Sequence, residues 1–161
     1  MQYVYIWWRE CKIPAILIDR GVVAMGTVHA EITIKNYNDC LLHAQGIVKE
    51  EDVRSITVTA VVDTGAATLV INEEQRQALG LGIMEERNAR VADGRWVFCQ
   101  ITQGVEIHWK DRWMLCPAMV IPNADPVLLG AIPLEGMDLV ISPARQELVG
   151  AHGDEIKFMV Y

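Results

Sequence analysis

The chain has 161 residues, enough for one domain with a sizeable buried core. Hydrophobic residues make up 52% of it and charged residues 22%, so it is too apolar for a disordered chain. The net charge of −7 argues against nucleic acid as the main partner. No uninterrupted apolar run approaches the roughly 20 residues of a membrane helix. We therefore expect a cytoplasmic protein without a nucleic-acid or membrane partner.

Metal-binding residue patterns are not found either. The cysteines have no CxxC spacing and the histidines form no i, i+4 pair, which makes a zinc site improbable. We expect no cofactor, and we interpret the cysteines as reduced thiols scattered through the core. They are Cys11, Cys40, Cys99 and Cys116.

Residues 1–24 differ in character from the rest. Their apolar stretches, Tyr3 to Trp8 and Ile13 to Ile18, are interrupted by charges, and no clear signal-peptide cleavage site follows. They are interpreted either as an extra strand or loose arm, or as an extension that precedes a natural start at Met25. We favour the second interpretation, with a domain over residues 25–150 and a C-terminal tail over residues 151–161.

The first regular elements of the domain are expected to be strands. Thr27 to Lys35 alternates cleanly, with Val28, Ala30, Ile32 and Ile34 on one face. Asn36 to Asp39 is rich in turn-forming residues, and Cys40 to Val48 is predicted to return as the second strand of a hairpin. Lys49 to Arg54 is predicted to be a charged, solvated connection without function.

The next stretch places one acid at the end of an apolar strand. Alternation over Ile56 to Val62 predicts a buried strand, and Ala66 to Ile71 is a second apolar segment. Asp63 lies between them, where an ionised carboxylate is costly to bury without partners. The following Gly65 permits a tight turn and the close approach of another chain. This composition suits a carboxylate that takes part in a reaction.

A helix and a hairpin follow. Asn72 is expected to cap a short helix with Gln75 in a capping box, and Gly80 to end it. Ala89 to Phe98 is expected to form a β-hairpin with Asp93-Gly94 at its tip. Trp96 in this hairpin is either a wall of a substrate site or core, and core is the commoner fate of a lone tryptophan.

The remaining elements make the chain mostly β, with two short helices in all. Four strands are expected at Gly104 to Trp109, Arg112 to Ile121, Leu139 to Ile141 and Gln146 to Val149. A buried strand over Val127 to Leu129 and a short helix over Pro133 to Met137 lie between them. His108, Trp109 and Trp113 cluster in sequence, which we interpret as packing rather than as a site.

Two motifs resemble a known family. Asp63-Thr64-Gly65-Ala66 in its apolar frame resembles the active-site motif of the retropepsin-like aspartic peptidases. Pro126 to Gly130 followed by Ile132 to Glu135 resembles the second hallmark of that family, whose strand packs behind the catalytic loop. The similarity covers roughly Met25 to Gly150 and looks closest to single-domain bacterial members. It implies a closed β-barrel of the acid protease fold, with a flap hairpin.

The resemblance also implies an activity. Aspartic peptidases use one carboxylate as base toward a water and a second, protonated one as acid. The chain has one Asp-Thr-Gly, so the resemblance implies a homodimer that pairs two copies of Asp63 and cuts protein or peptide substrates. Thr64 would bond across the two-fold axis, and Gly65 would let the substrate backbone approach. The substrate-binding residues implied by the family are Ala66, Ala67, Ala92, Asp93, Gly94 and Leu128.

Ala67 departs from the family pattern, because viral members usually carry an acid there. Actin-like ATPases are nearly excluded by chain length, and haloacid-dehalogenase phosphatases by Gly65, where they need a second acid. The alternative that remains is a catalytically inert retropepsin-fold module that binds or dimerises without cutting. An intact Asp-Thr-Gly favours the peptidase.

Overall fold

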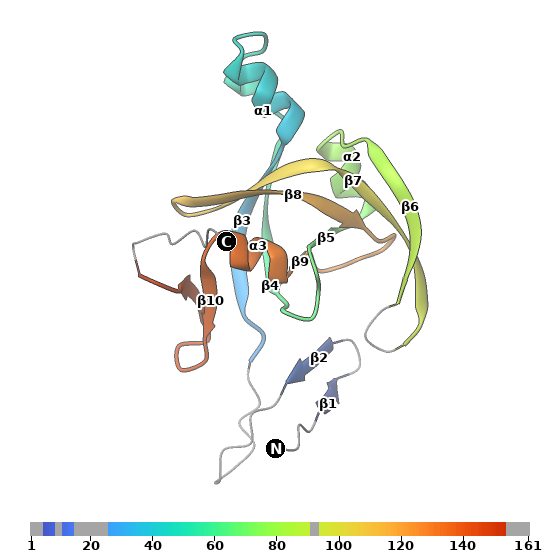
Figure 1. The fold of residues 1–161 in the computed structure, drawn as a ribbon, viewed down its shortest axis with the longest axis vertical. Helices are drawn as coiled ribbons and strands as arrows, with labels where there is room; N and C mark the ends of the chain where they lie inside the picture. The colour runs from blue at the N-terminus through green and yellow to red at the C-terminus, as the bar shows by residue number, and fades with distance from the viewer. Residues whose placement is uncertain (1–4, 9–10, 15–25, 91–93, 154–161) are drawn as a thin grey trace, which may run out of the picture.

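A computed structural model describes residues 5–8, 11–14, 26–90 and 94–153. The main sheet has seven strands in the order β3-β4-β9-β5-β8-β7-β6, and an additional pairing of β3 with β7 closes six of them into a barrel (Figure 1). Its strands are β3 (His29–Asn36), β4 (Ser55–Val62), β5 (Leu69–Ile71), β6 (Ile83–Arg90), β7 (Trp96–Trp109), β8 (Arg112–Val120) and β9 (Leu128–Leu129).

Helices and two small hairpins complete the fold. The helices are α1 (Tyr37–Ala44), the 3₁₀ helix η1 (Glu50–Asp52), α2 (Glu73–Ala78) and α3 (Ala131–Gly136). Strands β10 (Leu139–Ser142) and β11 (Glu147–Gly150) form the predicted closing hairpin. The N-terminal strands β1 (Tyr5–Trp8) and β2 (Cys11–Pro14) pair as an antiparallel hairpin, rather than as the single strand or loose arm considered above. No helix in the described ranges is long and apolar enough to cross a membrane.

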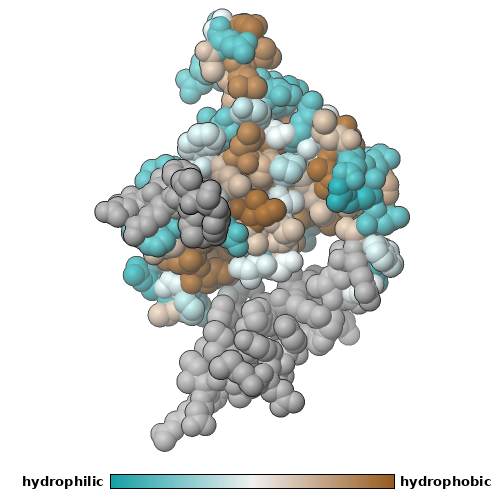
Figure 2. Space-filling model, viewed as in Figure 1, coloured by the Kyte–Doolittle hydropathy of each residue, from teal (hydrophilic) through white to brown (hydrophobic). Residues whose placement is uncertain are grey.

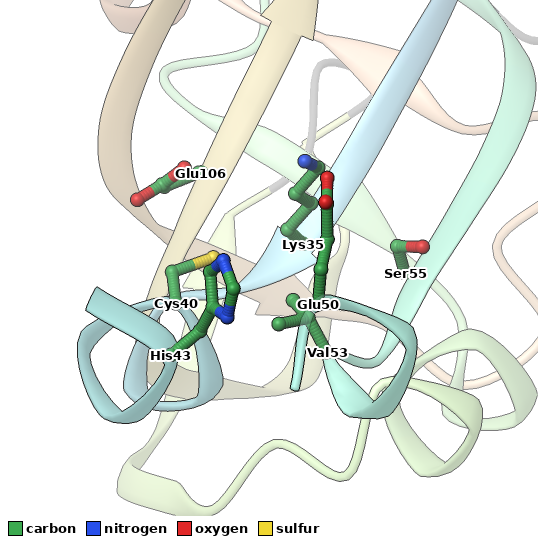
Figure 3. Close-up of a pocket in the computed structure, with 7 residues that line it drawn as sticks. All are labelled: Lys35, Cys40, His43, Glu50, Val53, Ser55 and Glu106. Atoms are coloured by element: carbon green, nitrogen blue, oxygen red, sulfur yellow. The ribbon is translucent and has the colours of Figure 1, made fainter. Parts of the chain in front are cut away.

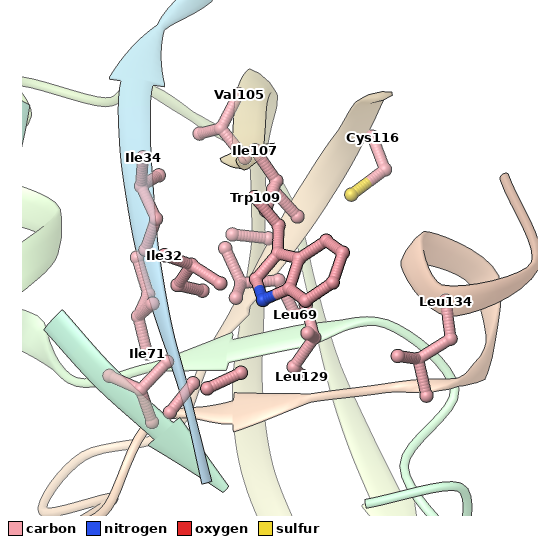
Figure 4. Packing of buried hydrophobic residues seen from close by; sticks show 14 of the residues in the cluster. Ile32, Ile34, Leu69, Ile71, Val105, Ile107, Trp109, Cys116, Leu129 and Leu134 are labelled. Carbon is pink, nitrogen blue, oxygen red and sulfur yellow. The ribbon is translucent and has the colours of Figure 1, made fainter. Parts of the chain in front are cut away.

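The barrel encloses one hydrophobic core, because alternate side chains of each strand point inward (Figure 4). The predicted apolar face of β3 is buried in full, and Ile32 and Ile34 are among the largest fully buried side chains. Trp109 packs in the same cluster, as expected. Cys99 and Cys116 are buried free thiols, whereas Cys40 is only half-buried. The core-thiol interpretation therefore holds for Cys99 and Cys116 and is wrong for Cys40.

The predicted strand over Cys40 to Val48 is wrong, because residues 37–44 form helix α1. The Asn36 side chain caps this helix, and its Oδ1 accepts from the backbone N–H of Asn38 at 2.9 Å. Asp39 in the first turn pairs with Arg54, with Nε to Oδ2 at 2.7 Å. An N-cap and a first-turn acid both favour a helix. With α1, the described chain has three α-helices rather than the expected two.

Most of the other expected elements are confirmed, although the first arm of the hairpin begins at Ile83 rather than at Ala89, and the predicted connection over Lys49 to Arg54 contains η1. Asn72 and Gln75 form the predicted capping box of α2, and Gly80 follows the helix with φ of 60°. Strand β7 is longer than expected, because the hairpin arm and the next predicted strand are one continuous strand of 14 residues. Figure 2 shows apolar side chains on the surface both in the middle of this face and on α1, which projects from the barrel. Leu41 and Leu42 are exposed on α1.

Candidate functional site

Asp63 is the first residue after β4, at the end of the barrel opposite α1 (Figure 1). Strand β4 runs parallel to β9 with Val62 beside Leu129. This pairing continues into the loop, because the Asp63 N–H donates to the Leu129 carbonyl at 3.0 Å. The backbone of Asp63 is therefore held by the sheet, while its side chain is half-buried at the start of the loop.

The loop turns sharply at Thr64 and Gly65, which are both exposed. The Gly65 N–H donates to Asp63 Oδ1 at 2.8 Å, and the Ala66 N–H donates to the Asp63 carbonyl at 3.1 Å. A Cβ atom on Gly65 would lie 3.1 Å from Asp63 Oδ1, closer than most side chains tolerate. The glycine thus lets the backbone approach the carboxylate and fix its orientation.

The outgoing arm of the loop is bonded to the start of α3. The Ala66 carbonyl accepts from Ala131 N–H at 2.8 Å, and the Ala67 carbonyl accepts from Ile132 N–H at 3.0 Å. Gly130 passes so close to this arm that an added Cβ would lie 2.4 Å from the Thr68 carbonyl oxygen. The two sequence motifs, around Asp63 and around Gly130, therefore meet in space.

The remaining predicted site residues fall in three places. Ala66 is half-buried and Ala67 exposed on the loop. Leu128 is half-buried in β9, where it pairs with Val61 and Val70. Gly94 has φ of 87°, as a tight hairpin turn requires. Ala92 and Asp93 lie outside the described residues, and their assignment stays a prediction, as do the roles of Thr64 and Gly65.

The predicted hairpin is confirmed, with Arg90 opposite Trp96 as the last described pair. The interpretation of Trp96 as core is wrong, since 71% of the residue is exposed. Phe98, two residues along the same strand and thus on the same face, is also exposed. The reason is that this hairpin extends beyond the barrel, which leaves this face exposed in the described part of the chain. Its arms run toward the end of the barrel that carries the Asp63 loop (Figure 1).

Thr68 is a buried polar residue of this loop that the sequence patterns did not single out. It ends the loop, is 8% exposed, and donates from Oγ1 to the Pro117 carbonyl of β8 at 2.8 Å. The available signal was a hydroxyl inside an otherwise apolar segment, because buried polar groups need partners.

A separate cavity of about 290 Å³ lies between α1 and the outer face of the barrel (Figure 3). It is near the start of β4, whereas Asp63 follows the end of that strand. Burial, with the Glu106 carboxylate as the next cause, raises the pKa of the Cys40 thiol in its wall. Its lining residues are Lys35, Cys40, His43, Glu50, Val53, Ser55 and Glu106. Across the described ranges, no group of three or more His, Cys, Asp or Glu residues is placed to hold a metal ion.

The loop presents one partly exposed carboxylate with a fixed backbone. A single carboxylate can act as a general base toward a water molecule. Its neighbouring residues Thr64 and Gly65 are open to the surface.

Comparisons with known proteins agree with this geometry. The family model described as aspartyl protease matches residues 50–132, just over half of the chain, and this match contains Asp63 and Gly130. No curated protein matches the sequence significantly.

Three solved structures are similar to this chain at low sequence identity. The retroviral protease-like domain of Ddi1 from Leishmania major is 17% identical with a TM-score of 0.50, over 81% of this chain and 90% of that one. EIAV protease, complexed with the inhibitor HBY-793, is 17% identical with a TM-score of 0.47, over 74% and 92%. A retropepsin-like aspartic protease from Rickettsia conorii is 19% identical with a TM-score of 0.40, over 73% and 88%. By its family match this chain belongs to the aspartyl protease family, and its mostly β structure has the retropepsin-like fold.

Proposed function

We propose that the protein is an aspartic endopeptidase that works as a homodimer, with one Asp63 from each chain. The observation that carries the proposal is the Asp63 loop, in which a carboxylate is oriented by Gly65 N–H at 2.8 Å beside exposed Thr64. A second copy can approach the open side of this loop and bring a second Asp63 to the first. A two-fold axis would place the same residue on both sides.

Paired carboxylates would divide the chemistry between them. Two like charges in contact are unfavourable, so the pair would keep one proton near its working pH. The ionised carboxylate would take a proton from a water molecule, which attacks the scissile carbonyl carbon. The protonated carboxyl would donate to the carbonyl oxygen, and a proton would pass to the leaving nitrogen as the C–N bond breaks. Cleavage should therefore show a bell-shaped pH profile with an acid-side optimum.

The direct test is cleavage of an unfolded protein at acidic pH, with and without pepstatin, by wild type and Asp63→Asn. The variant removes the charge but keeps much of the side-chain shape, and it should lose cleavage while remaining a dimer in sedimentation. Asp111→Asn is the matched control, since Asp111 is exposed in the turn between β7 and β8. Activity of Asp63→Asn equal to wild type would refute the assignment.

Protein concentration tests the dimer. Activity per chain should rise with concentration near the dimer dissociation constant, and full activity in a demonstrated monomer would contradict the proposal. A wild type that dimerises but leaves every unfolded substrate intact would instead favour an inert binding module.

A further inference from the structure

Two buried threonine hydroxyls lie on either side of one peptide group of β8. Thr68 Oγ1 donates to the Pro117 carbonyl at 2.8 Å, and the Ala118 N–H donates to Thr102 Oγ1 at 3.2 Å. This carbonyl and this N–H belong to the same peptide group, which is planar and stiff. Thr68 is 8% exposed, Thr102 2% and Ala118 0%. One rigid unit is thus bonded from both sides in the interior.

Each hydrogen bond in this bridge has a definite direction. Thr102 Oγ1 accepts from Ala118 and donates its own proton to the Gln103 carbonyl at 2.7 Å. The pairing of β7 with β8 is irregular between Ile101 and Gly104, so Thr102 lies where the regular ladder is interrupted. Its hydroxyl therefore accepts from the buried Ala118 N–H in place of a ladder carbonyl.

The two ends of the bridge belong to different parts of the site. Thr68 ends the loop that begins at Asp63, and it is followed directly by β5. Thr102 pairs with Ile83, the first residue of β6, so it lies at the base of the hairpin formed by β6 and β7. A single peptide group of β8 therefore connects the carboxylate loop to the base of the hairpin.

We propose that Thr68 and Thr102 are positioning residues that couple the placement of the Asp63 loop to the placement of this hairpin. Their importance for catalysis rests on the proposed peptidase function, whereas the mechanical coupling itself does not. Neither hydroxyl touches the Asp63 carboxylate in the described contacts. They act by fixing the Pro117–Ala118 peptide group, against which the loop and the hairpin base are both held.

The variants that test this coupling are Thr68→Val, Thr102→Val and the double variant. Valine keeps the branched shape and removes the hydroxyl, and with it one buried hydrogen bond to the Pro117–Ala118 peptide group. Thr68→Ser and Thr102→Ser keep the hydroxyl and should behave like wild type. Thr33→Val is the matched control, because the hydroxyl of Thr33 bonds that of Thr57 on an exposed part of β3 and β4.

Amide hydrogen exchange of Gly65 and Ala66 is the first readout, since both N–H groups bond Asp63 within the loop. We expect faster exchange in Thr68→Val and also in Thr102→Val, although Thr102 lies outside the loop. Unchanged exchange at Gly65 and Ala66 in Thr102→Val would overturn the coupling. This readout needs no activity, so it decides the inference even if the wild type proves not to be a peptidase.

Cleavage kinetics is the second readout. Thr68→Val should lower kcat by about tenfold with little change in KM, because the carboxylate is misplaced. Thr102→Val should raise KM as well, since the hairpin base moves. The loss of kcat/KM in the double variant should be smaller than the product of the single losses by at least about threefold. If the loss of kcat/KM in the double variant equals the product of the single losses while the serine variants stay fully active, the two threonines have separate structural roles. That result would contradict the proposal.

Discussion

The connection before β4 lies at the α1 end of the barrel, and the Asp63 loop after β4 lies at the opposite end. Different kinds of interaction hold these two ends in place. At the Asp63 end, backbone groups of distant segments bond the loop directly, as between Asp63 and Leu129 or between Ala66 and Ala131. At the α1 end, side chains make the main contacts that hold the segments together, because Asn36 caps α1 and Arg54 forms an ion pair with Asp39. The Asp63 end depends mainly on close backbone packing, with the Thr68 hydroxyl in addition, and the α1 end depends mainly on hydrogen-bonding side chains and charge.

This difference predicts different responses to mutation. Backbone contacts at the Asp63 end leave no space for an added atom, so small increases in volume should be severe there. At the α1 end the polar pairs can be removed one at a time, and each removal should lower stability without moving Asp63. The following variants test that contrast from the largest expected effect to the smallest.

Gly130→Ala should have the largest effect. Gly130 has an ordinary φ of −86°, so its cost is steric: the new Cβ would lie 2.4 Å from Thr68 O and 2.6 Å from Ala66 O. Because these atoms are backbone, relief requires the whole arm to move, and we expect a loss of about 3 kcal/mol or more in the free energy of unfolding. Urea unfolding measures this loss.

Gly46→Ala is the control for Gly130→Ala at the other end of the barrel. Gly46 has φ of 72° with nothing within 4 Å of an added Cβ, so only backbone strain opposes the change. We expect a cost of about 1 kcal/mol. Equal costs at the two glycines would contradict the view that close backbone packing sets the Asp63 end apart.

Asn36→Ala should cost about 2 kcal/mol, the sum of a lost helix cap and an unpaired buried carbonyl. Asn36 is 2% exposed, and its Nδ2 also donates to the Leu79 carbonyl at 2.9 Å. Asn72→Ala is the matched control, because Asn72 caps only its own helix, and it should cost about 1 kcal/mol. Thermal or urea unfolding compares the two, and wild-type kcat in folded Asn36→Ala checks that Asp63 has not moved.

The sequence predicted the Asp63 end well because its information is local and periodic. Alternation located β3 and β4, and the Asp-Thr-Gly and Gly130 motifs marked the two segments that meet. The contact between them was expected only by resemblance, since it rests on backbone hydrogen bonds between residues more than 60 positions apart. No side-chain pattern encodes such bonds. The bridge through Thr68 and Thr102 left only a weak signal, the hydroxyl of Thr68 inside an otherwise apolar segment.

The α1 end was mispredicted because its residues support two interpretations. Asn36 to Asp39 contains turn formers that are also helix caps, and the apolar residues that follow it fit a strand or a helix. Arg54, which is 15 positions further along the chain, supports the helix because it bonds Asp39 through both its backbone N–H and its guanidinium. Trp96 shows a related limit, because composition does not reveal that its hairpin extends beyond the core.

Asp39→Asn should have a smaller effect than Gly130→Ala or Asn36→Ala, and its dependence on pH identifies the cause. Hydrogen bonds from the Arg54 guanidinium, only partly opposed by burial, hold the pKa of the Asp39 carboxyl below its usual range. The unfolded chain therefore binds more protons than the folded one between the two pKa values. The stabilisation from this pair is complete above the unfolded pKa of about 3.9 and is lost as the pH falls through the lower, folded pKa.

At neutral pH we expect Asp39→Asn to cost about 1 kcal/mol, since the Arg54 side chain is 49% exposed and water screens the pair. Urea unfolding of wild type and variant at pH 7 and at several values below 4 measures the difference, which should shrink as the solution becomes more acidic. Exposed Asp111→Asn should stay within about 0.5 kcal/mol of wild type at each pH. A cost for Asp39→Asn that stays constant from pH 7 to pH 2 would mean that shape, rather than charge, holds α1 on the barrel. The contrast between the two ends would then be lost, because both would depend on packing alone.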